Sequence, residues 1–174
     1  ASCRMILNQD GSMQLQMGAT EIGQGADTVF TQMAAEVTGI TEDKVNVLST
    51  QDTDVSPFDT GAYASRQTYV SGMAVKKTGA IFKEKILDYA AYMLEKPQDT
   101  LDVRDNHIVD KETGTQLLPM EELATTAFYS LDRSVHITAE ATSHCKTNTF
   151  ATGACFAEVE VDMPLGKVKV TNIV

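Results

Sequence analysis

One apolar stripe near the middle of the chain constrains its fold more than any other feature. From Val75 through Phe82 and Ile86 to Met93, apolar residues and glycine recur at intervals of four and three, which predicts one buried face along a long helix. The helix should end before Pro97, because the residue before a proline is disfavoured in helical geometry. A helix with one apolar face needs another layer to pack against.

Strands and shorter helices supply that layer. Alternating apolar and polar residues predict a hairpin over residues 5–17, a strand at 45–47, two short strands within 101–118, a strand at 135–139 and a hairpin over 157–170. Shorter helices are predicted over 29–37, ended by Gly39, and over 119–128, with Pro119 as the first helical residue. Residues 51–61 are predicted to form a loop. We therefore expect one α+β domain over residues 1–174, with mixed sheets, one long helix and two shorter ones.

Composition excludes several classes of partner. A net charge of -10, from 24 acidic and 14 basic side chains, argues against nucleic acid and anionic membranes. No apolar run approaches the roughly 20 residues that span a bilayer, and the first four residues lack the features of a signal peptide. The chain lacks an initiator methionine and both begins and ends in strand-like patterns, so we expect a piece of a longer subunit.

The three cysteines favour neither a disulfide framework nor a thiolate metal site. They are odd in number and share no CxxC spacing, which indicates a reducing cytoplasm. Cys145 and Cys155 are expected to be small buried hydrophobic residues.

Two segments rich in small residues precede predicted helices. Residues 18–25 contain Gly23, Gln24 and Gly25, and residues 59–66 contain Ala64 and Ser65. Glycine lets a ligand approach the backbone, and successive N–H groups at a helix start can bind an anion without a cationic side chain. A tight connection, with Ser65 as an N-cap, would explain the same residues. Neither a Walker A loop nor the full dinucleotide-binding spacing is present.

The loop predicted over residues 51–61, which overlaps the start of the second segment, is acidic. Asp52, Asp54 and Asp59 lack the regular alternation and the final bidentate glutamate of a calcium loop, so we expect loop capping and solvation. Arg66 could contact a phosphate, form a salt bridge with Asp54 or Asp59, or lie on a solvated helix face.

The order of four strings identifies a resemblance. Residues 18–28 (GATEIGQGADT), 32–36 (QMAAE), 52–54 (DTD) and 61–66 (GAYASR) resemble the molybdopterin-binding subunits of the xanthine dehydrogenase and aldehyde oxidase family, particularly the bacterial xanthine dehydrogenases. The likeness runs from about residue 4 to the end. It implies a molybdenum cofactor-binding fold in which pterin sulfurs, rather than protein ligands, hold the metal. The pterin could carry a cytosine nucleotide.

The resemblance also implies roles for particular residues. Gly23, Gln24 and Gly25 would contact the pterin, with the Gln24 amide donating towards the molybdenum, and Ala64 and Ser65 would line the pterin and substrate side. The bulky residue at position 63 departs from family members with a small residue there, which leaves the size of the substrate open.

The activity implied is hydroxylation of hypoxanthine and xanthine towards urate, with water as the oxygen source. Electrons would leave through 2Fe-2S clusters and FAD in partner domains or subunits of an oligomeric assembly. The family's base glutamate lies outside this sequence, so no catalytic residue is assigned, and Glu21, Glu158 and Glu160 are expected to be turn or solvent-facing residues. Two alternatives stay open: a module that binds another phosphorylated ligand, and a folded piece that binds nothing without the remainder of the molybdenum subunit.

Overall fold

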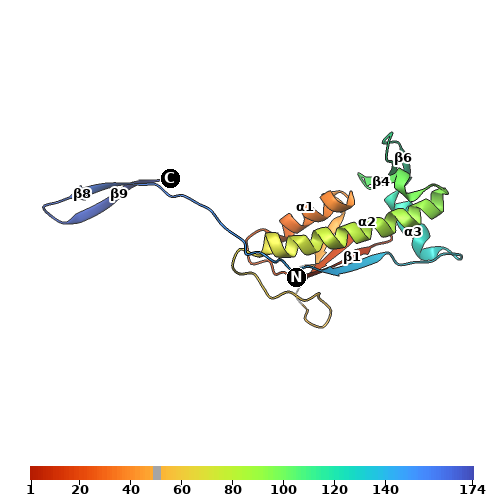
Figure 1. Ribbon diagram of the computed structural model, residues 1–174, viewed down its shortest axis with the longest axis horizontal. Coiled ribbons are helices and arrows are strands. Elements are labelled where there is room, and N and C mark those ends of the chain that lie inside the picture. Colours follow the sequence, from red (N-terminus) through yellow and green to blue (C-terminus); the bar gives the residue numbers. More distant parts are fainter. Residues whose placement is uncertain (49–51) are drawn as a thin grey trace.

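A four-stranded sheet covered on one face by two helices forms the body of the protein (Figure 1). The computed structural model describes residues 1–48 and 52–174, so Gln51, where the predicted loop begins, lies outside the described residues. The strand order is β3-β2-β1-β7. None of the helices within the described residues has the length and apolar character needed to cross a membrane.

The predicted N-terminal hairpin forms the centre of this sheet. Strands β1 (Ser2–Leu7) and β2 (Met13–Met17) pair antiparallel, with Met5 opposite Leu15. Strand β7 (Thr138–Thr142) adds antiparallel to β1, and β3 (Val45–Leu48) runs parallel to β2. Met5 and Leu15 are fully buried, because alternate side chains of a strand point to the same face of the sheet.

The two helices confirm the predicted apolar stripes. Helix α1 (Ala26–Thr38) ends at Gly39, which adopts the left-handed conformation with φ of 82°. Helix α2 (Gly72–Leu94) contacts α1, β1 and β7, and buries Val75, Phe82 and Ile86 completely. Burying side chains of this size contributes roughly 1.5–3 kcal/mol each. The long helix is thus the central packing element of the body.

A second sheet and a third helix lie at the C-terminal end of α2. Strands β4 (Leu101–Arg104), β5 (His107–Asp110) and β6 (Gln116–Pro119) pair in sequence order, and α3 (Met120–Tyr129) follows. The sequence predicted two strands here, not three, because β6 has four residues and buries only Leu118 among them. Pro119 ends β6 with an extended backbone, so the helix begins one residue later than predicted. Short 3-10 turns span Glu42–Lys44 and Gln98–Thr100.

The predicted C-terminal hairpin forms but stands apart from the body (Figure 1). Strands β8 (Ala157–Asp162) and β9 (Lys167–Ile173) pair antiparallel, and every residue in them is exposed. The prediction that Cys145 and Cys155 are buried is wrong. Cys145 is half-buried and Cys155 exposed, because both lie on the segment that leads from the body to this hairpin, whereas Cys3 on β1 is buried. All three are free thiols.

Candidate functional site

The two segments predicted to bind a ligand lie side by side. We call residues 18–25, before α1, the glycine loop, and residues 59–66, before α2, the serine loop. A Cβ atom at Gly18 would lie 2.2 Å from the carbonyl oxygen of Pro57 and 2.5 Å from the amide nitrogen of Asp59. Only glycine allows the two backbones to approach this closely.

An open cleft of about 390 Å³ separates the exposed parts of the two loops. Its lining comes from both loops and from the first residues after the serine loop: Ile22, Gln24, Ala62, Tyr63, Ser65, Arg66, Gln67 and Thr68. The structure therefore brings Gln24 and Ser65 together, although they are far apart in the sequence.

The two glycines of the glycine loop adopt left-handed backbone conformations. Gly23 and Gly25 have φ angles of 96° and 82°, and a Cβ atom built at either would meet nothing within 4 Å. Glycine is needed at these two positions for the left-handed backbone rather than for lack of space. Neither glycine is among the residues that line the cleft, to which the glycine loop contributes Ile22 and Gln24.

The amides of the glycine loop already have an anionic partner. The Glu21 carboxylate accepts the N–H groups of Gly23 (2.7 Å), Gly25 (3.1 Å) and Asp27 (3.0 Å). These hydrogen bonds lower the pKa of Glu21 below its ordinary value, and the bond from the Asp27 amide has the largest effect. The amides of Gly23 and Gly25 thus bind a carboxylate, and Glu21 is more than a turn residue. That residues 23–25 bind an external anion stays a prediction.

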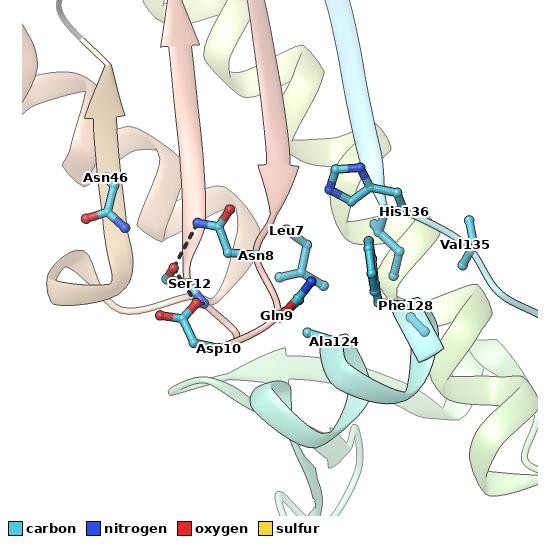
Figure 2. A pocket seen from close by; sticks show the side chains of 12 residues that line it. Leu7, Asn8, Gln9, Asp10, Ser12, Asn46, Ala124, Phe128, Val135 and His136 are labelled. Carbon is cyan, nitrogen blue, oxygen red and sulfur yellow. Dashed lines mark hydrogen bonds between the residues drawn. The ribbon is translucent and has the colours of Figure 1, made fainter. Parts of the chain in front are cut away.

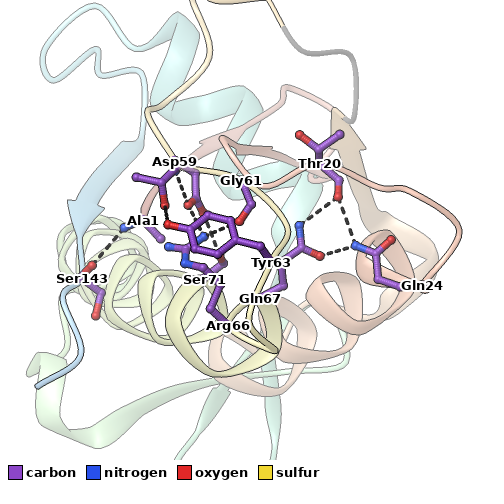
Figure 3. A network of polar contacts seen from close by, with 11 residues as sticks. Ala1, Thr20, Gln24, Asp59, Gly61, Tyr63, Arg66, Gln67, Ser71 and Ser143 are labelled. Atoms are coloured by element: carbon purple, nitrogen blue, oxygen red, sulfur yellow. Dashed lines mark hydrogen bonds and ion pairs between the residues drawn. The ribbon is translucent and has the colours of Figure 1, made fainter. Parts of the chain in front are cut away.

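Gln24 and Gln67 join the two loops (Figure 3). Nε2 of Gln24 donates to the side-chain oxygen of Gln67 and to the carbonyl oxygen of Thr20, 3.1 Å away. Nε2 of Gln67 donates to the same carbonyl at 2.9 Å, and Oε1 of Gln24 accepts the Ile22 amide at 2.6 Å. Because both hydrogens of the Gln24 amide are engaged, a bond from Gln24 to a cofactor requires one of these bonds to be exchanged.

The serine loop turns outward through two left-handed residues. Ala64 and Ser65 have φ angles of 50° and 54° and are both exposed. This conformation costs roughly 1–2 kcal/mol for each residue with a Cβ atom, and such strain concentrates at ligand-binding sites. The prediction that Ser65 is an N-cap is wrong. A π-helical turn, Gln67–Ser71, leads into α2, and the N-cap position of this turn is Arg66, which makes no side-chain capping bond.

A buried ion pair holds the serine loop in place (Figure 3). The Asp59 side chain is 0% exposed and that of Arg66 is 12% exposed. Asp59 accepts hydrogen bonds from Arg66 and from the Ser71 hydroxyl (2.7 Å), while Arg66 also donates to the Gly61 carbonyl (2.8 Å) and lies over the Tyr63 ring. Burial alone would raise the pKa of Asp59, but the bonds from Ser71 and Arg66 and the Arg66 charge outweigh it, so the pKa is lowered.

The predicted salt bridge between Arg66 and Asp59 is therefore confirmed, whereas Asp59 is not solvated. Asp52 caps its loop by accepting the Asp54 amide at 3.0 Å, as expected. Within the described part of the chain, no group of three or more histidine, cysteine, aspartate or glutamate side chains is arranged to hold a metal ion. Glu158 and Glu160 are exposed on β8.

A second cleft, which the sequence did not indicate, lies between the β1–β2 turn and the end of α3 (Figure 2). It has a volume of about 590 Å³, and Asp10, Asn46, Phe128 and His136 are among its lining residues. The Asp10 carboxylate accepts the amide (3.0 Å) and the hydroxyl (2.6 Å) of Ser12, and these bonds lower its pKa. The acidic group of this cleft thus serves the hairpin turn.

Comparison with known proteins decides the family. A model of the family described as "Molybdopterin cofactor-binding domain" matches residues 1–174. The chain belongs to the molybdopterin cofactor-binding domain family. The expectation from the ordered strings is confirmed.

Relatives of this molybdopterin-binding domain are larger proteins. The xanthine dehydrogenase molybdenum-binding subunit of Escherichia coli O157:H7 is 45% identical over 174 residues, which are 99% of this chain and 23% of the relative. The carbon monoxide dehydrogenase large chain of Hydrogenophaga pseudoflava is 28% identical over 97% of this chain and 21% of its own length. The chain thus spans less than a quarter of these relatives.

A solved structure confirms the predicted fold. Quinoline 2-oxidoreductase from Pseudomonas putida 86 superposes with a TM-score of 0.85 over 99% of this chain and 22% of its own, at 23% sequence identity. The α+β prediction, with one long and two shorter helices, therefore agrees with both the structure and the comparison.

The residues of the cleft fit one wall of a molybdopterin site. Its edges carry the exposed side chains of Ile22, Tyr63 and Ser65 and the uncharged amide of Gln24. The cation in its lining, Arg66, is paired with Asp59. Glu21 occupies the amide cradle of the glycine loop. These groups suit the uncharged, amide-like edge of a pterin better than a phosphate, because the Glu21 carboxylate would repel a second anion.

Proposed function

We propose that this domain supplies one wall of the molybdopterin site in a larger xanthine dehydrogenase-like subunit. Gly23, Gln24 and Gly25 would contact the pterin from one side, and Ala64 and Ser65 would line the pterin and substrate side. The observation that carries the proposal is the convergence of the glycine and serine loops on one cleft, which is lined by the exposed, left-handed Ser65, with the left-handed Ala64 next to it in the chain. Residues 1–174 would form one domain of that subunit.

When bound, the cofactor supplies a molybdenum centre able to accept electrons from the substrate. The residues of this chain would bind and orient it. We propose purine hydroxylation, hypoxanthine and xanthine towards urate with oxygen from water. The 45% identity to a xanthine dehydrogenase subunit supports this choice. None of the described residues is proposed as the catalytic base.

The wider assembly belongs to the same proposal. Partner domains or subunits would carry 2Fe-2S clusters and FAD, in an oligomer located in the cytoplasm, and the pterin could carry a cytosine nucleotide. The three free cysteines agree with a reducing compartment. Nucleic acid and membranes are not proposed as partners, because the chain carries a net charge of -10.

The experiment uses the full-length subunit in its native assembly, with Gln24→Ala compared with Gln98→Ala. Gln98 also donates through its amide to a main-chain carbonyl, but lies at the other end of α2. We expect Gln24→Ala to lower molybdenum and pterin content, and wild-type enzyme to place oxygen from labelled water in urate. Purine turnover by an assembly without molybdenum would refute the proposal. So would Gln24→Ala with unaltered cofactor content and turnover.

Of the two alternatives, a module for another phosphorylated ligand is the less favoured, because the Glu21 carboxylate fills the amide cradle. We also expect the isolated chain to retain no stoichiometric molybdopterin. A cofactor contacted by several segments loses most of its contacts when only one wall is present. Pterin fluorescence after oxidation measures this, and a stoichiometric signal from the isolated chain would contradict it.

A further inference from the structure

Gln67 is the buried link between the two loops that form the cleft. It is the first residue of the π-helical turn before α2, and it is 8% exposed, whereas Gln24 at the glycine loop is exposed. Its side chain is one of few buried polar groups among the described residues. A buried amide is retained only when its donors and acceptors are satisfied.

The side chain of Gln67 forms its hydrogen bonds, among the described residues, with the glycine loop. Its Nε2 donates to the Thr20 carbonyl at 2.9 Å, and its Oε1 accepts from Gln24. Gln24 in turn accepts the Ile22 amide at 2.6 Å, so one connected set of bonds runs from the π-helical turn before α2 to the glycine loop. The glycines at 23 and 25 contribute no side chains that could pack this loop against the body.

We infer that Gln67 is a positioning residue, which fixes the glycine loop and the Gln24 amide relative to the serine loop before the cofactor binds. Its effect on the cofactor rests on the proposed function, whereas its effect on the loop does not. The bond from Gln67 to the Thr20 carbonyl does not use the Gln24 amide, so it can persist when Gln24 exchanges a partner for the cofactor. A loop that is already ordered loses less conformational entropy on binding, so removing this bond weakens cofactor retention without removing a cofactor contact.

The test compares Gln67→Met with Gln98→Met in the full-length assembly. Methionine fills a similar volume without the amide, and Gln98→Met removes the same kind of bond, 3.2 Å to the Glu84 carbonyl. Hydrogen exchange by mass spectrometry should show amides of residues 20–25 exchanging roughly tenfold faster in Gln67→Met, as expected for a lost hydrogen-bonded link. Exchange within α2 should match the control.

Cofactor retention is the second measurement. Molybdenum content after dialysis should fall several-fold in Gln67→Met and stay at the wild-type value in Gln98→Met. If Gln67→Met does not assemble, Gln67→Glu keeps the acceptor for Gln24 and loses the donor to Thr20, and should still accelerate exchange of the loop.

The outcomes distinguish the positioning role of Gln67, its effect on the cofactor and the proposed function of the domain. Unchanged exchange of residues 20–25 overturns the positioning role, whatever the cofactor does. Faster exchange with normal molybdenum retention, while Gln24→Ala does lose cofactor, overturns the link between positioning and cofactor. If Gln24→Ala also keeps its cofactor, the proposed function itself fails.

Discussion

Replacing Asp59 by alanine should be among the most destabilising single changes near the cleft. The substitution leaves the Arg66 guanidinium, 12% exposed, without its counter-charge, and leaves the Ser71 hydroxyl without the acceptor 2.7 Å away. Breaking a buried ion pair costs about 3–5 kcal/mol. Because Arg66 keeps its bond to the Gly61 carbonyl, we expect the lower end, about 3 kcal/mol.

The assay is urea denaturation followed by circular dichroism. Asp88→Ala serves as the control, because it breaks an ion pair with Arg133 whose side chains are 58% and 42% exposed, and such pairs contribute about 0–1 kcal/mol. A double-mutant cycle with Arg66→Met should give a coupling energy of about 2 kcal/mol between Asp59 and Arg66. Additive effects of the two substitutions, or a cost for Asp59→Ala no larger than for Asp88→Ala, would refute the reasoning.

The same pair predicts how stability depends on pH. The folded-state pKa of Asp59 is lowered, so its contribution is fully present above the unfolded pKa of about 3.9 and is lost as pH falls through the folded value. The stability difference between wild type and Asp59→Asn should therefore shrink on acidification below about pH 4. A difference that stays constant down to pH 2 would show that the carboxylate charge contributes nothing.

Three further outcomes can be measured. Gly18→Ala should destabilise the protein by more than about 2 kcal/mol, because its Cβ atom would lie 2.2 Å from a main-chain carbonyl oxygen. The Cβ atom of Gly25→Ala would meet nothing within 4 Å, so this substitution should cost only the roughly 1–2 kcal/mol of a left-handed backbone. Equal losses in urea denaturation would contradict this. An NMR titration should place the pKa of the Glu21 carboxyl below the ordinary glutamate value. The glycine loop should therefore stay ordered above about pH 4.3 and lose order as the pH falls further. A raised pKa for Glu21 would contradict its hydrogen bonds to the loop amides. Iodoacetamide at pH 8 should alkylate the exposed Cys155 within minutes, while Cys3, whose pKa burial raises to about 12, should react only after unfolding.

The local pattern of the sequence was sufficient to locate most elements. The apolar stripe from Val75 to Met93 located α2, and Gly39 located the C-terminal end of α1. Both signals could be read locally, because helical periodicity and a left-handed C-cap are properties of neighbouring residues. Where the local signal was short it failed: β6 buries one side chain, and Pro119 ends a strand instead of starting a helix. The ordered strings identified the family without any structure.

Only the tertiary structure decided how the site is built. Nothing in the sequence near Gly18 indicates that the serine loop packs against it, since that contact joins segments about 40 residues apart. The occupation of the amide cradle by Glu21, the burial of Asp59 and the link through Gln67 likewise depend on where the chain returns in space. Periodicity records which face of an element is buried, but the energy of a polar contact depends on its partner's position and on the water excluded around it.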